Sequence, residues 1–171
     1  PAALGYAQAS GSMYGQALLK NPYVGRTFIQ PTQMQRENAV KLKLTPLAEN
    51  VKGKRIVLVD DSIVRGTTSI KIINMLRAVG AKEVHMRIAS PPVRYPCCFG
   101  INTPSTRLLI GSGRSEEEIC KRIGADTLAY LELDMLQDAV ADGKKGPCGF
   151  CHGCFSGKYP LDIHKCKKMG C

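Results

Sequence analysis

The sequence predicts an α/β domain with a mainly parallel sheet, and two observations indicate it. Residues 54–61, KRIVLVDD, are a short apolar run rich in β-branched side chains, which is typical of a buried parallel strand. A helical pattern and a second strand follow directly, so residues 54–90 form one β-α-β unit. The 171 residues, of which 44% are hydrophobic, suffice for one globular domain with a core.

Within this unit, apolar residues recur at helical spacing from Ile70 to Val79, and Gly80 is a good stop for the helix. Residues 83–90 then alternate apolar and polar side chains, as a strand does. The other predicted elements, in chain order, are a helix over residues 1–10, strands over 15–20 and 40–44, a helix over 116–124 behind a capping box of Ser115 and Glu118, a strand over 126–131 and a helix over 132–140.

The N-terminus lacks the basic start and apolar core of a signal peptide, and no apolar run approaches the length of a membrane span. We therefore expect a cytoplasmic protein without a membrane partner. The chain also lacks an initiator methionine and begins in what reads as the middle of a helix, which suggests a fragment of a longer protein.

The net charge of +10 is unevenly distributed. Residues 144–171 contain six lysines, one aspartate and five of the eight cysteines. A nucleic-acid surface beside a zinc knuckle is one interpretation, but the segment has no interleaved aromatic side chains for base stacking. A phosphorylated small substrate also suits a basic chain, and we expect no nucleic-acid partner.

The stretch VLVDDSIVRGTTS, Val57 to Ser69, carries the strongest functional signal. Asp60 and Asp61 end the predicted strand, where α/β sheets bind ligands, and carboxylates suit sugar hydroxyls or Mg²⁺. Gly66 lets the backbone approach a ligand closely, and the following helix N-terminus favours phosphate. A turn with a helix cap is the alternative, but two acids followed by Gly-Thr-Thr-Ser exceed what a cap requires. A sugar phosphate satisfies both halves of the stretch.

This stretch resembles the phosphoribosyl pyrophosphate (PRPP) signature of type I phosphoribosyltransferases, and more closely that of the glutamine PRPP amidotransferase (amidophosphoribosyltransferase) family. Three further stretches are similar to that family: KNPYVGRTFIQP, SPPVRYPCCFGIN and CHGCFSGKYP, which with the signature span Lys20–Pro160. The resemblance implies a type I phosphoribosyltransferase fold, incomplete at its N-terminus, over residues 1–143. It implies a Cys- and Lys-rich segment packed on that domain over residues 144–171, and no N-terminal glutaminase domain.

By the same resemblance, Asp60 and Asp61 bind Mg²⁺ and the ribose hydroxyls. The residues that wrap the 5-phosphate of PRPP are Ser62, Ile63, Val64, Arg65, Gly66, Thr67, Thr68 and Ser69. Residues 20–37 resemble the flexible loop that closes over PRPP, in which Lys20, Arg26 and Arg36 supply cations for pyrophosphate. The catalytic set is thus Lys20, Arg26, Asp60 and Asp61. A solvated surface loop is the alternative for residues 20–37.

Cysteines 148, 151 and 154 are spaced C-x-x-C-x-x-C, which alone allows zinc, an iron–sulfur cluster or a redox pair. In the iron–sulfur subclass of the family, the matching positions Cys97, Cys151 and Cys154 bind a 4Fe-4S cluster whose fourth ligand lies upstream of this chain. With that ligand missing, the site could hold a cluster, zinc or nothing. Cys120 is expected to be a buried helix cysteine.

The resemblance implies the first committed step of de novo purine biosynthesis. Ammonia from glutamine attacks C1 of PRPP, giving 5-phosphoribosylamine and pyrophosphate. Purine nucleotides as inhibitors and a homo-oligomer, a tetramer when intact, are implied in the same way. The family's pyrophosphate loop lies before Pro1, so our hypothesis is that this chain alone is inactive. A PRPP-binding regulator or a salvage phosphoribosyltransferase domain is the alternative, but CHGCFSGKYP has no role in either.

Overall fold

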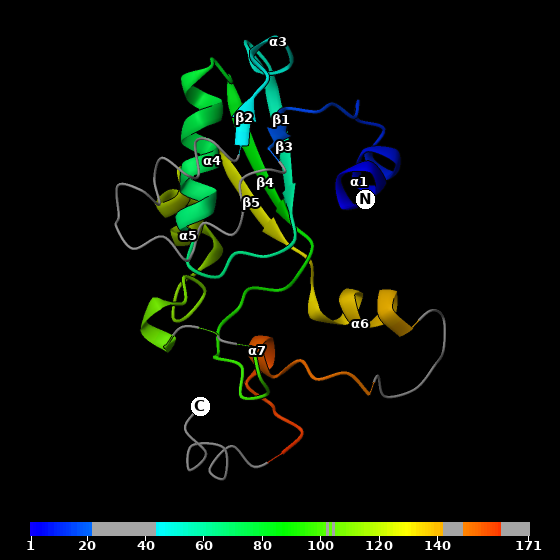
Figure 1. The fold of residues 1–171 in the computed structure, drawn as a ribbon. Coiled ribbons are helices and arrows are strands. Elements are labelled where there is room, and N and C mark those ends of the chain that lie inside the picture. Colours follow the sequence, from blue (N-terminus) through cyan, green and yellow to red (C-terminus); the bar gives the residue numbers. More distant parts are fainter. Residues whose placement is uncertain (22–43, 102, 104, 142–148, 162–171) are drawn as a thin grey trace.

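The computed structural model describes residues 1–21, 44–101, 103, 105–141 and 149–161 (Figure 1). In this part of the chain the elements are α1 (Ala2–Ser10), β1 (Leu18–Lys20), β2 (Leu44–Pro46), α3 (Ala48–Val51), β3 (Arg55–Asp60), α4 (Thr67–Ala78), β4 (Glu83–Ile88), the 3₁₀ helix η2 (Thr106–Leu108), α5 (Glu116–Ile123), β5 (Thr127–Tyr130), α6 (Leu133–Ala141) and α7 (Gly153–Ser156). The predicted β-α-β unit is confirmed as β3-α4-β4.

The central sheet has the order β3-β4-β5, and both strand pairs are parallel. The register aligns Asp60 with Ile88, and Ile88 with Tyr130. The Ala89 amide donates to the Asp60 carbonyl at 2.9 Å, which carries the pairing beyond the end of β3. The carboxyl ends of the three strands therefore meet at one edge of the sheet, and this confirms the mainly parallel sheet that the sequence predicts.

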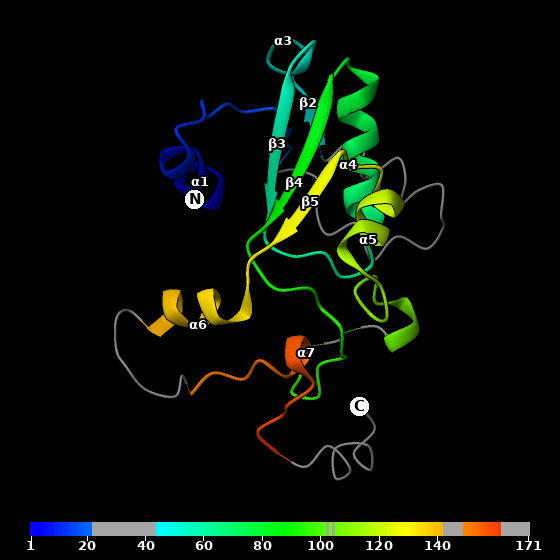
Figure 2. The ribbon, with the colours of Figure 1, turned by 180° about the vertical axis from the view of Figure 1, so that it is seen from behind.

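Helices α4 and α5 cover one face of this sheet, while α1 lies beside β3 (Figures 1 and 2). Every second residue of β4 is buried, and the polar residues between them, such as His85, are half-buried. Leu76 of α4 and Ile119 of α5 are fully buried against that apolar face. The core thus joins the sheet to these two helices.

The helix α5 begins with the predicted capping box. The Glu118 amide donates to Ser115 Oγ at 3.2 Å, and the Ser115 amide donates to Glu118 Oε2 at 2.8 Å. Two donors of the first turn are satisfied in this way, so the helix start is fixed by its own sequence.

The N-terminal strands differ from the prediction. The strand predicted over residues 15–20 is confined to β1, and β1 pairs antiparallel with β2 in a separate two-stranded sheet. Of the strand predicted over residues 40–44, only Leu44 lies in the described part, where it is the first residue of β2. The short helices α3, η2 and α7 were not predicted, because three or four residues are too few to show a helical period.

Candidate functional site

The carboxylates of Asp60 and Asp61 lie at the carboxyl end of β3, at the edge where the parallel strands end. The Asp61 amide donates to Asp60 Oδ1 at 3.0 Å, and Ser62 Oγ donates to Asp61 Oδ1 at 2.7 Å. Burial raises the pKa of Asp60, the Asp61 amide opposes this, and the Asp61 charge adds to the rise. Two adjacent carboxylates that repel each other at a sheet edge are suited to a cation or to hydroxyl donors.

We call residues 61–66 the β3–α4 loop. Apolar contacts and one backbone hydrogen bond on its buried side hold this loop in place. Ile63 is only 2% exposed, and Val64 offers its carbonyl to the Ile110 amide at 2.9 Å. Gly66 has φ +79°, and a Cβ built on it would lie 2.5 Å from Ile110 Cδ1. The loop thus follows a path that only glycine fits at position 66.

The N-terminus of α4 continues from this loop. Gly66 occupies the N-cap position, where no side chain caps the helix. Thr67 and Thr68 are exposed, whereas Ser69 is only 2% exposed and points into the protein. Uncapped amides of a first helical turn, flanked by two exposed hydroxyls, are chemically suited to phosphate.

The remaining residues that were predicted to bind the substrate differ in how far their side chains are exposed to solvent. Arg65 is exposed, and Ser62 and Val64 are half-buried. Lys20 is an exposed residue of β1, where it pairs with Leu44. Arg26 and most of the 20–37 connection lie outside the described residues, so their predicted role at the pyrophosphate stays a prediction.

The predicted cluster cysteines lie in one region, on the segment after β4 and around α7. The amides of Arg94 and Tyr95 both donate to the Cys154 carbonyl at 3.0 Å. Charges on Cys97 and Cys151 are near enough to raise the pKa of the Cys154 thiol, although burial is the larger cause. Cys148 lies outside the described residues.

Tyr159 lies among these thiols. Burial raises its pKa to about 12, and cysteines 97, 98, 151 and 154 all contribute to the rise. Its hydroxyl donates to the Pro96 carbonyl, and its ring contacts Gly153 so closely that no Cβ fits there. CHGCFSGKYP is therefore folded against SPPVRYPCCFG, although fifty residues of the sequence separate them.

The candidate ligands in this cysteine region are thiolates, which are soft ligands that suit zinc or an iron–sulfur cluster. Among the described residues, the five cysteines form no disulfide, and no three Cys, His, Asp or Glu side chains are grouped closely enough to hold a metal ion. The thiols lie near one another and their chemistry suits such a group, but the described residues do not form a closed ligand set.

Among the described residues, Cys120 and the two histidines His85 and His152 have structural partners. Cys120 was expected to be buried; it lies in α5 as expected but is half-buried, and its Sγ donates to the Ala125 carbonyl at 3.3 Å. His85 lies 3.0 Å from both Glu83 Oε2 and Thr127 Oγ1. His152 lies 2.9 Å from Ser156 Oγ within α7. These contacts explain the side chains without a catalytic role.

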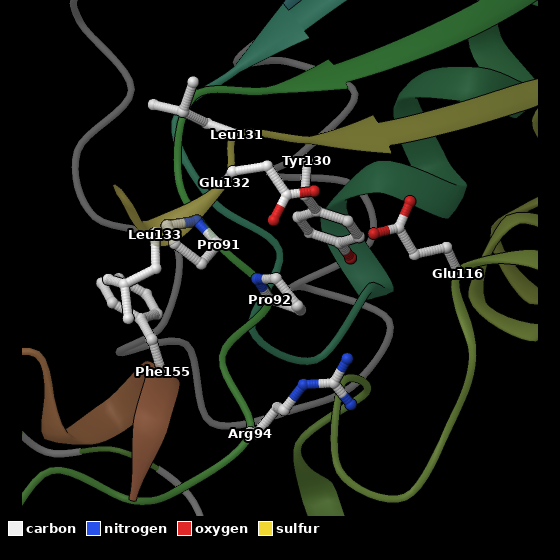
Figure 3. A pocket seen from close by; sticks show the side chains of 9 residues that line it. All are labelled: Pro91, Pro92, Arg94, Glu116, Tyr130, Leu131, Glu132, Leu133 and Phe155. Atoms are coloured by element: carbon white, nitrogen blue, oxygen red, sulfur yellow. The ribbon is translucent and has the colours of Figure 1, made fainter. Parts of the chain in front are cut away.

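A cavity of about 210 Å³ opens next to the carboxyl ends of β4 and β5 (Figure 3). Its wall includes Arg94, Glu116, Tyr130, Glu132 and, from α7, Phe155. Burial raises the pKa of Glu116, with the charge of Glu132 next in importance, while Arg94 lowers it. Burial also raises the pKa of Tyr130 to about 12.

The motif SPPVRYPCCFG carries a residue that the sequence did not single out for the β3–α4 loop, namely Arg94. Its guanidinium Nη1 donates to the carbonyls of Gly111 at 3.1 Å and of Arg114 at 3.4 Å. An arginine inside an otherwise apolar motif was the available signal, but its acceptors, seventeen and twenty residues away, could not be read from the pattern.

Within the described residues, every helix is too short or too polar to cross a membrane.

The sequence of this chain is similar to a known domain family and to curated proteins. The model of the phosphoribosyl transferase domain family matches residues 11–89. Amidophosphoribosyltransferase of Bacillus subtilis is 52% identical over 167 residues, 96% of this chain and 35% of the relative. That of Archaeoglobus fulgidus is 54% identical over 95% of this chain and 35% of the relative. The chain spans about a third of the length of these relatives.

Solved structures give the same result. The glutamine PRPP amidotransferase from B. subtilis, complexed with ADP and GMP, superposes with a TM-score of 0.82 at 52% identity. The match covers 95% of this chain and 36% of that one. A second structure, described as the allosteric regulatory enzyme of purine biosynthesis, has a TM-score of 0.81 at 51% identity over 94% of this chain and 35% of its own.

Proposed function

We propose that this chain, which is about half identical to amidophosphoribosyltransferases and matches a phosphoribosyl transferase domain over residues 11–89, is the PRPP-binding part of such an enzyme. The reaction is the transfer of the phosphoribosyl group of PRPP to ammonia derived from glutamine. The products are 5-phosphoribosylamine and pyrophosphate, and the step belongs to purine biosynthesis. The observation that carries the proposal is the uncapped N-terminus of α4, with two exposed threonines, directly after Asp60 and Asp61.

The two halves of this site divide one ligand between them. The 5-phosphate lies on the amides of residues 66–69 and the hydroxyls of Thr67 and Thr68, where the helix dipole favours its charge. The ribose hydroxyls donate to Asp60 and Asp61. Gly66 lets the backbone come within hydrogen-bond distance of the phosphate. Ser69 contributes through its amide, because its side chain is buried.

The chemical step needs little covalent participation from the protein. Ammonia attacks C1 of the ribose as the bond from C1 to the pyrophosphate oxygen breaks, and positive charge develops on the ring. Asp60 and Asp61 stabilise that charge, while Lys20 and Arg26 neutralise the leaving pyrophosphate. Closure of the 20–37 loop keeps water from the electrophilic carbon.

Asp60 and Asp61 are also the residues that would hold Mg²⁺, since this ion binds through one or two carboxylates together with substrate phosphates. Magnesium would supply charge neutralisation at the pyrophosphate. Cys97, Cys151 and Cys154 would hold a 4Fe-4S cluster together with a fourth ligand. In that position a cluster would tie α7 to the segment after β4, and the reaction needs no electron transfer from it.

Four further properties belong to the proposal. Purine nucleotides inhibit the intact enzyme, supported by the relative from B. subtilis that is complexed with ADP and GMP. The intact enzyme is a homo-oligomer, a tetramer, and works in the cytoplasm. Glutamine supplies the ammonia in a glutaminase domain outside the 171 residues.

Calorimetry with three ligands tests the site. We expect ribose 5-phosphate to bind more tightly than inorganic phosphate, and ribose to bind least, because each half of the site contributes. The double variant Thr67→Val/Thr68→Val should weaken the binding of ribose 5-phosphate without affecting the fold, since both side chains are exposed. Replacing exposed Thr106, in η2, by valine is the matched control. Equal affinities for ribose 5-phosphate and phosphate would contradict a site for both groups.

A further inference from the structure

Arg94 connects two parts of the molecule that the sequence keeps apart. Its amide donates to the Cys154 carbonyl at 3.0 Å, which fixes its backbone against α7. Its guanidinium reaches in the other direction and donates to the carbonyls of Gly111 and Arg114 at 3.1 and 3.4 Å. Figure 3 shows the side chain extending away from Phe155 of α7, beneath Tyr130 and Glu116. Arg94 is thus anchored at its backbone and bound to a turn at its tip.

That turn, residues 109–114, lies directly under the β3–α4 loop. The Ile110 amide donates to the Val64 carbonyl at 2.9 Å, and Ile110 is 2% exposed. The Ile110 side chain fills the space that a Cβ at Gly66 would need. A shift of this turn by a few tenths of an ångström therefore moves the backbone whose amides face the phosphate.

Within the described part of the chain, the burial of Leu109, which is 0% exposed, also holds this turn in place. Gly111 approaches the Val93 carbonyl so closely that a Cβ would lie 2.7 Å from it. Arg114 Nη1 donates to the carbonyls of Leu109 and Ile110 at 3.3 and 3.2 Å, but these bonds lie within the turn. Of the two arginines, Arg94 is the one whose side chain ties the turn to another segment.

We propose that Arg94 is a positioning residue: by binding the 109–114 turn it holds the β3–α4 loop in the conformation that accepts the 5-phosphate. This inference rests on the proposed function, because it assigns a supporting residue to the same phosphate site. Arg94 does not touch the phosphate; it acts through Ile110 on Val64 and Gly66.

The variant Arg94→Met removes both donors and keeps most of the side-chain volume. The variant Arg94→Lys keeps a positive donor that can bind the same carbonyls. Arg77→Met is the matched control, because the Arg77 guanidinium also donates hydrogen bonds to other parts of the protein, to the Gly124 carbonyl at 3.2 Å and to Asp126 Oδ2 at 2.8 Å. These acceptors lie at the opposite edge of the sheet, where β4 and β5 begin.

The experiment measures the affinity of each variant of the 171-residue chain for ribose 5-phosphate by calorimetry, and its stability by urea unfolding. We expect Arg94→Met to bind about three- to thirty-fold more weakly, the range for residues that act on a site through neighbours. Arg94→Lys should recover most of the affinity. Arg77→Met should lose stability and keep the affinity. Unchanged affinity in folded Arg94→Met, or an equal loss in Arg77→Met, would overturn the inference.

Hydrogen exchange of the Ile110 amide separates this inference from the proposed function. If the wild-type chain does not bind ribose 5-phosphate, the proposed function fails. The amide should still exchange faster in Arg94→Met than in Arg77→Met, and equal rates would refute the role of Arg94. If Arg94→Met does not fold, Arg94→Gln keeps an N–H donor for one carbonyl, and it should show a smaller effect of the same sign in both measurements.

Discussion

Replacing Gly66 by alanine tests how closely the β3–α4 loop packs on the 109–114 turn. The new Cβ would lie 2.5 Å from Ile110 Cδ1 and 3.5 Å from Ile123 Cγ2, at a φ of +79°. A left-handed conformation costs a non-glycine residue about 1–2 kcal/mol. Overpacking a tight core adds about 1–3 kcal/mol. The free energy of unfolding should therefore fall by about 2–5 kcal/mol, measured by urea denaturation followed by circular dichroism.

Two further variants separate the backbone cost from the steric cost. Gly113 has φ +67° with nothing within 4 Å of a built Cβ, so Gly113→Ala should lose only the backbone share, about 1–2 kcal/mol. Ile110→Val removes Cδ1 and alone costs about 0.5–1.5 kcal/mol. Combined with Gly66→Ala, it should instead recover stability, so that the double-mutant cycle is non-additive by about 0.5–3 kcal/mol. An additive cycle, with Gly66→Ala no worse than Gly113→Ala, would refute the packing argument.

Three other predictions concern single side chains. Asp61→Asn should abolish the magnesium dependence of PRPP binding, because the ion loses a carboxylate; calorimetry with and without MgCl₂ that gives the same dependence as wild type would contradict this. Asp126 accepts hydrogen bonds from the Val84 amide and from Arg77, and these lower the pKa of its carboxyl below 3.8. The ionised carboxylate therefore contributes fully to the free energy of unfolding above pH 3.8, and this contribution is lost as the pH falls through the lowered pKa. Asp126→Asn should therefore cost about 1 kcal/mol at pH 7, modest because the pair is partly exposed, and less at pH 3; a pH-independent difference in urea unfolding would count against it. Ser115→Ala removes the side chain that caps α5 and should cost about 1 kcal/mol in thermal unfolding, whereas no loss would mean that the capping box contributes nothing.

The central unit could be predicted because its signals are local. The apolar run before Asp60, the spacing from Ile70 to Val79 and the capping box at Ser115 each lie within one element, and each element forms where expected. The position of the exposed start of α4 follows from the same stretch, since the end of β3 and the start of α4 are joined by six residues. Local patterns thus specify both the unit and the position of the candidate site.

The support beneath the site could not be predicted. Ile110 lies more than forty residues after Gly66, and nothing in its surroundings marks it as the neighbour of a glycine. Arg94 likewise finds its acceptors in a turn without regular structure. The antiparallel pairing of β1 with β2 also depends on a distant contact, which hydrophobic periodicity does not encode.

The cysteine region could be predicted in part. The spacing of Cys151 and Cys154 and the family resemblance at Cys97 indicated that these thiols lie together, and their effect on the pKa of Tyr159 agrees with a common location. The mode of joining, with two amides on the Cys154 carbonyl and Tyr159 against Gly153, involves backbone groups that have no sequence signature. The sequence therefore indicated which residues meet, but not how they are held.

The most direct measurement is a ¹⁵N–¹H correlation spectrum of the 171-residue chain during titration with ribose 5-phosphate. The amides of Gly66, Thr67 and Thr68 should show the largest, saturable shifts, because they point at the phosphate. Ribose alone should leave them unchanged. Shifts that instead centre on the cavity beside Glu116 and Tyr130, or no shifts at all, would contradict a phosphate site at the start of α4.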